Sequence, residues 1–434
     1  MANIKKCLCL TAVLMTTSQL TWAAGFQLKE QSASLQGLSF AGATAKASDA
    51  STIFFNPAGM TRLSHTEAYG NLSLIKPTAK FKAESVTAAT GGGGAFPVSS
   101  DSNGGDAGAL SAVPAVYGMT TLDNGVRLGL SVNTPFGLST EYSDDWVGRY
   151  YALKSELLTI NVSPNIAFKV NDKLSLGFGG EFQYIQAELT NSINVDSILG
   201  GGASDGFSRL KGDDIGFGFR LGGLYEFNED TRVGISYKSR IRHTLEGDIK
   251  IENVGALAGN ALFKNADVTA NIQTPDVLSI GAFHSINPQW SVLADASWTN
   301  WSVFKDLHVV NSDGGLVRQN VEENWKDSYF VSTGVEYHPC NCTNKTYQFG
   351  IAYDKTAIKD EYRTFRIPGE DRYWLSAGYL YDWGKDKSLG IGYSHIFVDE
   401  AKVTENSSAA NKGVISGNYD SSVDILSVNL SMKF

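Results

Sequence analysis

Long hydrophobic runs and cysteine are what this sequence most clearly lacks. Beyond residue 23, no stretch approaches the roughly 18 consecutive apolar residues that a membrane-spanning helix needs. Only two of the four cysteines, Cys340 and Cys342, fall in that part, so disulfides do not hold the fold together. Their C-x-C spacing has no nearby His/Cys pair to complete a metal site. We expect a local disulfide or two free thiols in a turn, and no metal or cofactor.

The first 23 residues have the pattern of a cleavable secretory signal. Lys5 and Lys6 form a short positive region, and an apolar run follows from Cys7 to about Leu20. Cleavage after Ala23 would leave small residues at the positions that signal peptidase reads. The alternative, a membrane anchor, needs a run of roughly 20 apolar residues, and this run is shorter. We therefore predict export, with a mature chain beginning at residue 24.

The charge balance excludes one class of partner. The formal net charge is −9 at pH 7 and there is no basic cluster, which argues against nucleic acid as a partner. Glycine and aromatic residues are abundant, with 45 Gly and 11% aromatic. For an exported chain without a spanning helix, this composition leaves a soluble β protein or an outer-membrane β-barrel.

From residue 65 onward, apolar and polar residues alternate with a period of two. In the stretch 174–184, for example, five apolar side chains share one face: Leu174, Leu176, Phe178, Phe182 and Tyr184. The other face carries small or polar residues, including Glu181 and Gln183. The alternating stretches are about 10–15 residues long, as tilted strands that cross a bilayer must be, whereas strands of soluble proteins usually have about five or six.

The connections between these stretches favour the membrane. Short turns, such as 171–173 and 228–230, alternate with long Gly-rich segments such as 87–108. The chain ends in Phe434 after a final alternating stretch, which is the usual address for the barrel-assembly machinery. We predict that residues 65–434 form a 14-stranded antiparallel transmembrane β-barrel. It would be a monomer in the lipid and lipopolysaccharide of a Gram-negative outer membrane.

Residues 24–64 do not alternate, and they predict a different structure. The segment is rich in small residues, yet Phe40, Ile53, Phe54 and Phe55 make it too apolar for a disordered tail. We predict a folded hatch, or plug, inside the barrel. Near its end lies the turn Asn56, Pro57, Ala58 and Gly59, which taken alone is an ordinary turn sequence.

Several stretches resemble the FadL family of outer-membrane transporters, which includes long-chain fatty acid transporters and TodX-type aromatic hydrocarbon transporters. They are "AGFQLKEQSASLQGLSFAGATAKASDASTIFFNPAGM", "TPFGLSTEY", "WKDSY" and "IPGEDRYWLSAGYLYDW". The resemblance implies a hatch that carries an Asn-Pro-Ala motif, here residues 56–58, beside an inward kink of the third strand. The kink maps to Thr134, Pro135, Phe136 and Gly137, and it would open the wall.

The resemblance also implies a ligand pocket. Phe26 matches the family's apolar residue near the mature N-terminus, and we place Phe54 and Phe55 beside it. Family members that bind carboxylates use basic residues at the pocket, and no residue here matches those positions directly. Arg318, Lys326 and Arg220 are possible substitutes, so a fatty acid and a neutral hydrocarbon both stay open.

Two segments between strands, 191–210 and 251–265, are more apolar than water-facing loops need to be. We predict that they form a groove that captures a hydrophobic ligand. The candidate residues are Ile198, Leu199, Phe207, Leu257, Leu262 and Phe263. The alternative is that the loops only pack against each other over the barrel mouth.

Three other functions fit the sequence less well. An outer-membrane lipolytic enzyme would use the G-x-S-x-G match at 202–206, but this lies in a Gly-rich loop without the strand–turn–helix setting of a nucleophile elbow. We therefore expect no catalytic residues. A general porin needs neither a plug nor apolar loops, and an adhesin or phage receptor is a secondary role of such loops.

Overall fold

The computed structural model describes residues 25–87, 89–91, 94–96, 102–199, 202–340, 344–406 and 412–434. The predicted signal sequence, 1–23, and Cys342 lie outside these residues. Cys340 is exposed.

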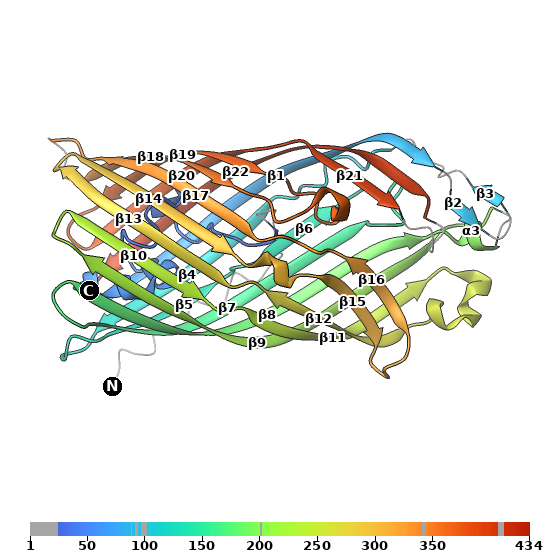
Figure 1. Cartoon of the computed structure of the whole chain (residues 1–434), viewed down its shortest axis with the longest axis horizontal. Helices are drawn as coiled ribbons and strands as arrows, with labels where there is room; N and C mark the ends of the chain where they lie inside the picture. The colour runs from blue at the N-terminus through green and yellow to red at the C-terminus, as the bar shows by residue number, and fades with distance from the viewer. Residues whose placement is uncertain are drawn as a thin grey trace.

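The described chain forms a closed antiparallel barrel (Figure 1). Strand β1 pairs with β22 on one side and with β4 on the other, which closes the sheet. Closure leaves no free sheet edge facing lipid, which a bilayer would not tolerate. The wall segments, in chain order, are β1 (Glu67–Thr87), β4 (Ser111–Thr121), β5 (Arg127–Asn133), β6 (Gly137–Glu141), β7 (Lys154–Lys169), β8 (Leu174–Ile193), β9 (Gly206–Glu226), β10 (Thr231–Lys238), β11 (Ile241–Glu252), β12 (Ala266–Thr274), β13 (Val277–Asn287), β14 (Trp290–Thr299), β15 (Asp306–Asn311), β16 (Val317–Glu322), β17 (Ser328–Tyr337), β18 (Lys345–Asp354), β19 (Arg372–Asp382), β20 (Lys387–Val398), β21 (Ala401–Asn406) and β22 (Val414–Lys433).

Six wall strands of the described chain are split into two segments each: β5/β6, β10/β11, β12/β13, β14/β15, β16/β17 and β20/β21. The 20 segments of the sheet therefore make 14 strands. The predicted 14-stranded fold is confirmed, and the alternating stretch 174–184 lies in β8.

The alternation sorts side chains between lipid and lumen. Along β8, apolar residues such as Phe178 and Phe182 are 49% and 47% exposed on the outer face. The polar residues between them, Glu181 and Gln183, are buried on the inner face. A sheet with an apolar outside and a polar inside is the reverse of a soluble protein and suits a lipid solvent.

Residues 25–64 lie inside the barrel, near the end that has the short turns (dark blue in Figure 1). Their short helices are α1 (Ala33–Gln36), α2 (Thr52–Phe55) and the 3-10 helix η1 (Pro57–Arg62). Nearly all of this segment is buried, and Leu28, Leu38 and Phe40 pack against inward side chains of the wall. We call this segment the hatch. No helix in the described ranges has the length and apolar character to cross a bilayer.

The opposite end carries the long connections. The elements there are β2 (Ala89–Gly91), β3 (Gly94–Phe96), α3 (Val195–Leu199), η2 (Gly255–Gly259), η3 (Ala261–Phe263) and η5 (Asp360–Tyr362). The remaining short helix, η4 (Trp301–Val303), lies in the break between β14 and β15. Figure 1 shows β2, β3 and α3 beyond the far end of the wall strands. Long loops face the outside of the cell in barrels of this kind, so this end is extracellular.

Candidate functional site

The Asn-Pro-Ala-Gly turn starts the helix η1. Asn56 is extended (φ −157°, ψ 103°), and its side-chain oxygen accepts from the Ala58 N–H at 3.1 Å. Pro57 occupies the first helical position, where no N–H is needed. The amide nitrogen of Asn56 donates to the carbonyl oxygens of Thr44 at 2.7 Å and Gly223 at 3.0 Å. One side chain thus joins η1, another part of the hatch and the wall.

Three wall residues that face this turn are glycines. A Cβ at Gly177 would lie 2.4 Å from the backbone of η1, and one at Gly222 would lie 2.2 Å from the Asn56 side chain. A Cβ at Gly234 would lie 2.0 Å from a hatch carbonyl. The missing side chains let the hatch backbone lie directly on β8, β9 and β10. We call these three residues the glycine seat.

The glycine seat specifies where the turn lies. The resemblance placed the motif of residues 56–58 beside the wall kink. The motif itself lies on β8–β10, while η1 also contacts β7 and β5, the strand that runs into the kink. The hatch residues that hydrogen-bond to the kink are 26–31, at the other end of the hatch.

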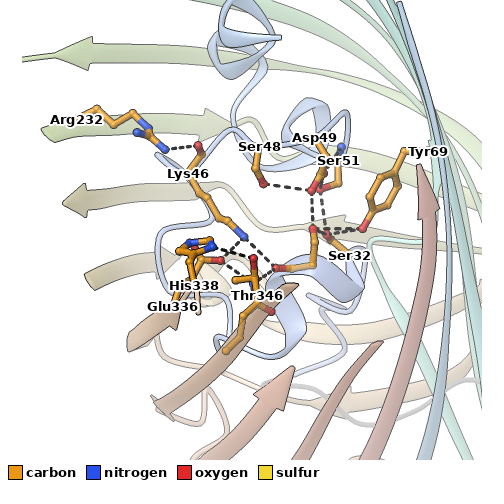
Figure 2. Close-up of polar contacts among 12 residues, drawn as sticks. Ser32, Lys46, Ser48, Asp49, Ser51, Tyr69, Arg232, Glu336, His338 and Thr346 are labelled. Carbon is orange, nitrogen blue, oxygen red and sulfur yellow. Dashed lines mark hydrogen bonds and ion pairs between the residues drawn. The ribbon is translucent and has the colours of Figure 1, made fainter. Parts of the chain in front are cut away.

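A buried ion pair tethers the middle of the hatch to the wall (Figure 2). Lys46 Nζ lies 2.7 Å from Glu336 Oε1 on β17, and both side chains are about 5% exposed or less. Lys46 Nζ also donates to the Ser34 carbonyl at 3.3 Å. From the opposite side, Arg232 donates to the carbonyls of Ala45 and Lys46 at 2.8 and 2.6 Å. Removing one partner of such a pair costs about 3–5 kcal/mol, so this region of the hatch is held firmly.

A second polar group in the same view fixes the hatch turn at Asp49. Its carboxylate accepts from the Ser34 hydroxyl at 2.6 Å and from the Ser51 N–H at 3.0 Å. The Ser32 hydroxyl is 2.9 Å from the Tyr69 hydroxyl on β1 (Figure 2). The hatch is therefore bonded to opposite sides of the barrel.

The third wall strand is interrupted at the predicted position. Strand β5 ends at Asn133, opposite Asn161 of β7, and β6 begins at Gly137, opposite Leu158. Between these pairs the third strand advances four residues while β7 advances three, so the kink holds one extra residue. On the other side, β4 pairs with β5 only, over residues 116–121. Apart from isolated bridges, the described part of β6 has no partner strand on that side.

The N-terminal part of the hatch bonds to the backbone that this interruption leaves free. The Leu28 N–H donates to the Pro135 carbonyl at 2.8 Å, and the Gly137 N–H donates to the Phe26 carbonyl at 2.8 Å. The Gln31 side chain donates to the carbonyl just before the proline at 2.8 Å. Residues 26–31 thus satisfy kink groups that a neighbouring strand would otherwise satisfy.

Phe26 anchors this contact in an aromatic cluster. Its ring centroid lies 4.6–6.0 Å from four others, those of Phe136, Trp301, Phe304 and Trp325. Gly25, with φ +68°, passes between the two indoles, where a Cβ would come within 2.6 Å of Trp325. Phe26 therefore packs beside the kink, and it does not line the luminal cavity described next.

A small cavity of about 60 Å³ lies between the hatch and the wall. It includes the predicted Phe54 and Phe55, and it reaches Pro135 of the kink. Its other lining residues are Gln27, Leu28, Lys29, Phe40, Ala43, Thr44, Arg220, Ser236, Lys238, Val277, Ser279, Asp295, Ser297 and Phe330. We call this cavity the luminal pocket. Four phenylalanine rings, three basic side chains and one carboxyl group, that of Asp295, are among its lining.

The cations of the luminal pocket lie against aromatic rings. Lys29 Nζ is 4.3 Å from the centroid of Phe330, and Lys238 Nζ is 4.9 Å from that of Phe136. Burial lowers the pKa of Lys29, although nearby carboxylates oppose this. Arg220 stacks on Phe54 at 4.8 Å. Positive charge against apolar walls suits an anionic head on a greasy chain.

Two predicted pocket residues lie elsewhere. Arg318 is on β16, the extracellular segment of a split strand, and it donates to the carbonyls of Ala261 and Lys264. Lys326 lies in the break between β16 and β17, where its N–H donates to the Ala357 carbonyl, and it lines no described cavity. Both were assigned to the pocket by position in the sequence, and the break in their strand places them above it.

A second cavity, of about 440 Å³, lies among the extracellular segments. Of the predicted capture residues, Ile198, Leu262 and Phe263 line it, and Arg318 joins them. We call it the extracellular groove. The rest of its lining is Tyr150, Leu189, Asn191, Ser192, Ile193, Asn194, Ser208, Leu210, Ile249, Ile251, Gln319, Arg366 and Lys412.

Three predicted capture residues are not in the groove. Leu199 is 47% exposed on the surface of α3. Leu257 is buried in a small loop core with Val195 and Val254, and Phe207 packs on a separate cluster around Trp146. The alternative that the loops pack on each other is therefore also true, because this loop core supports the groove.

The groove carries three cations, Arg318, Arg366 and Lys412, that form no salt bridge with a described carboxylate, although the charge of Glu405 acts on Arg366 and Lys412. Arg366 donates to the carbonyls of Tyr151, Lys154 and Thr190 and to a serine hydroxyl, all neutral acceptors. Burial lowers the pKa of Arg366 to about 10 and that of Lys412 to about 8, so both stay largely charged at neutral pH. With Arg318, they place three basic side chains in the lining of an apolar groove.

Sequence reasoning missed Lys29, Lys238, Arg366 and Lys412. A weak signal existed for Lys238, an inward-facing charge in an alternating strand just before a break. Arg366 and Lys412 lie on loops far apart in the sequence, and only closure of the barrel brings them together.

Comparisons with known proteins agree with this architecture. Residues 14–434 match the family described as outer membrane protein transport protein (OMPP1/FadL/TodX). The chain is 29% identical to a long-chain fatty acid transport protein of Escherichia coli O6:H1, with 94% of each chain covered. A crystal structure of a FadL homologue from Pseudomonas aeruginosa superposes with a TM-score of 0.85 at 24% identity, covering 94% of this chain and all of the other. The toluene transporter TodX of Pseudomonas putida gives 0.70 at 18% identity, covering 92% and 97%.

The fold and the family match together define an outer-membrane transport protein. The chain belongs to the OMPP1/FadL/TodX family, whose members are transporters found in the outer membrane of Gram-negative bacteria. This membership argues against the alternative that the protein is a lipolytic enzyme.

Proposed function

We propose that this protein takes up long-chain fatty acids by capture in the extracellular groove, binding in the luminal pocket and lateral release at the kink. The single observation that carries the proposal is the groove, which combines an apolar lining with three basic side chains that form no described salt bridge. A hydrocarbon tail with an anionic head matches both features.

The energetics favour a route that keeps the tail out of water. Burial is worth about 0.8 kcal/mol per CH₂, so a 16-carbon chain prefers apolar surroundings by roughly 12 kcal/mol. A water-filled pore would forfeit most of that. The hatch fills this barrel, and its cavity reaches Pro135, where the third strand is interrupted.

The ligand must displace part of the hatch to bind. A cavity of about 60 Å³ has room for only a few water molecules, at about 10–15 Å³ each, and not for a long acyl chain. The contact of residues 26–31 with the kink depends on four hydrogen bonds, each worth about 1 kcal/mol net, and on the packing of Phe26. The burial energy of the tail exceeds the cost of breaking those bonds. The Lys46–Glu336 tether would meanwhile keep the rest of the hatch in place.

A second candidate ligand is a neutral aromatic hydrocarbon. The small luminal pocket, lined by Phe40, Phe54, Phe55 and Phe330, favours it. A single ring needs less displacement of the hatch than an acyl chain does. The groove cations, however, would have no role for such a ligand.

An uptake experiment separates the two candidates. Cells expressing the protein would be given labelled oleate or labelled toluene. We expect Lys412→Gln to lower oleate uptake about two- to tenfold, corresponding to about 0.4–1.4 kcal/mol, and to leave toluene uptake unchanged. Lys264→Gln, which removes an exposed loop charge outside the groove, is the control. Oleate uptake that is equal in both variants and in the wild type would contradict carboxylate capture.

We also propose how the protein is assembled in the membrane. Phe434 is 77% exposed at the end of β22, as an address for the barrel-assembly machinery requires. We propose a monomer surrounded by outer-membrane lipid and lipopolysaccharide.

A further inference from the structure

Three amide side chains form a row across the inner faces of three adjacent strands. Asn133 of β5 pairs in register with Asn161 of β7, and Asn161 pairs with Gln183 of β8. All three are 2% exposed or less. Asn133 is the last residue before the kink, so the row ends at the wall interruption. We call these residues the amide row.

Each residue of the amide row has a polar atom without a partner. Asn133 Oδ1, Asn161 Oδ1 and Gln183 Nε2 are buried and accept or donate no hydrogen bond among the described residues. Such an atom costs about 1–3 kcal/mol when it stays unpaired. Nineteen such atoms occur among the described residues, but these three lie in register on adjacent strands at the wall interruption, which makes the row a candidate place for a polar partner.

The amide row is connected to the luminal pocket. Arg220, which lines the pocket, lies 3.0 Å from Glu181. Glu181 in turn accepts from the Asn161 amide nitrogen at 2.5 Å. This bond fixes the orientation of Asn161 and leaves its oxygen free. A chain of polar contacts therefore connects the luminal pocket with Asn161, the register partner of the last residue before the kink.

The row selects for a particular kind of headgroup. It offers one free donor, on Gln183, and free acceptors on Asn133 and Asn161. The amides are uncharged, and the adjacent Glu181 is paired with Arg220, so the row itself offers no cation to a carboxylate. A head that both donates and accepts, such as a protonated carboxyl or a hydroxyl, satisfies the row, whereas a carboxylate does not.

We propose that the amide row binds the uncharged polar head of an amphiphilic ligand while its tail leaves through the kink. A carboxylate captured in the groove takes up one proton from solvent before its head enters the row. This inference rests on the lateral release proposed above, and it adds the residues that would carry the head.

The test uses 16-carbon probes that differ only at the head: palmitic acid, hexadecanol and hexadecane. In Asn133→Leu/Gln183→Leu, which leaves the Asn161–Glu181–Arg220 contacts in place, we expect acid and alcohol uptake to fall about fivefold or more. Hexadecane uptake should stay within about twofold. The control is Asn165→Leu. Asn165 lies on β7 and on the same face as Asn161, four residues farther from the kink, and its Oδ1 is also unpaired. It should change uptake of no probe by more than about twofold, and heat-modifiable gel mobility would confirm folding of each variant.

Two results would overturn the amide row. One is wild-type uptake of all three probes in the double variant, which would leave only bound water in the row. The other is an equal loss of all three, which would make the row structural. A wild-type protein that takes up none of the probes would instead contradict the proposed function.

Discussion

The N–H of Leu28 donates to the carbonyl oxygen of Pro135 at 2.8 Å. This bond joins a segment inside the barrel to a wall strand, at the point where the wall strand lacks a neighbour. The hatch therefore completes the sheet from within. Moving residues 26–31 would expose both a cavity and an interruption in the wall, so a single displacement could connect the two.

The glycine seat predicts the effect of adding a side chain under the hatch. In Gly177→Val, the new Cβ would lie 2.4 Å from the backbone nitrogen of Ala58 in η1, which is a steric clash. Such overpacking costs about 1–3 kcal/mol. We expect a folded barrel with a displaced hatch, seen as higher single-channel conductance and faster proteolysis of residues 25–64. Gly118→Val on β4, where a Cβ meets nothing within 4 Å, should behave like the wild type. Equal behaviour of the two variants would exclude the seat.

Hatch docking should weaken as the pH rises. Burial raises the pKa of Glu30 to about 7, with the charges of Arg372 and Lys29 opposing and Asp354 adding to the shift. A released hatch would have the ordinary value of 4.5, so docking is fully favoured below that pH and loses up to about 3 kcal/mol as the pH rises through about 7.

Hydrogen exchange of residues 25–40 at pH 5 and pH 8, corrected for intrinsic rates, measures this change. We expect lower protection at pH 8, and a smaller difference in Glu30→Gln. Protection that does not change with pH in the wild type would show that Glu30 does not oppose docking.

Removing the extra residue of the kink should close the wall. Deletion of Pro135 makes the third strand advance in step with β7, because the kink holds one residue more than its partner. We expect a folded barrel, with oleate uptake lowered at least about tenfold. Binding of oleate at the extracellular groove should persist, because the groove lies on other segments. Uptake at the wild-type rate would mean that the ligand leaves by another path.

The sequence predicts the wall well because alternation is a local property. The pattern within each strand shows which of its side chains face the lipid, and Phe178 and Phe182 are on that face as expected. Alternation also shows that Lys238 points inward. It does not show the height of a residue in the barrel, which depends on the tilt and register of strands far apart in sequence.

The site residues that were misplaced follow from this missing information about height in the barrel. Arg318 faces a cavity, but it lies above the break in its strand and so belongs to the groove rather than the pocket. Asn56 is a turn residue with a conventional capping role, and its place on the wall depends on glycines of three other strands. The groove cations Arg366 and Lys412 come from separate loops, and no local pattern connects them.

The most direct test of lateral release is a reversible lock between hatch and kink. Gln27 and Phe136 form an isolated antiparallel bridge, so their Cβ atoms are within reach of a disulfide. The variant Gln27→Cys/Phe136→Cys, with Cys340 and Cys342 replaced by serine, would be assayed for oleate uptake oxidised and reduced. The account predicts uptake at least about tenfold lower in the oxidised form and recovery on reduction. Equal uptake in both states, with the disulfide confirmed by mass spectrometry, would contradict it.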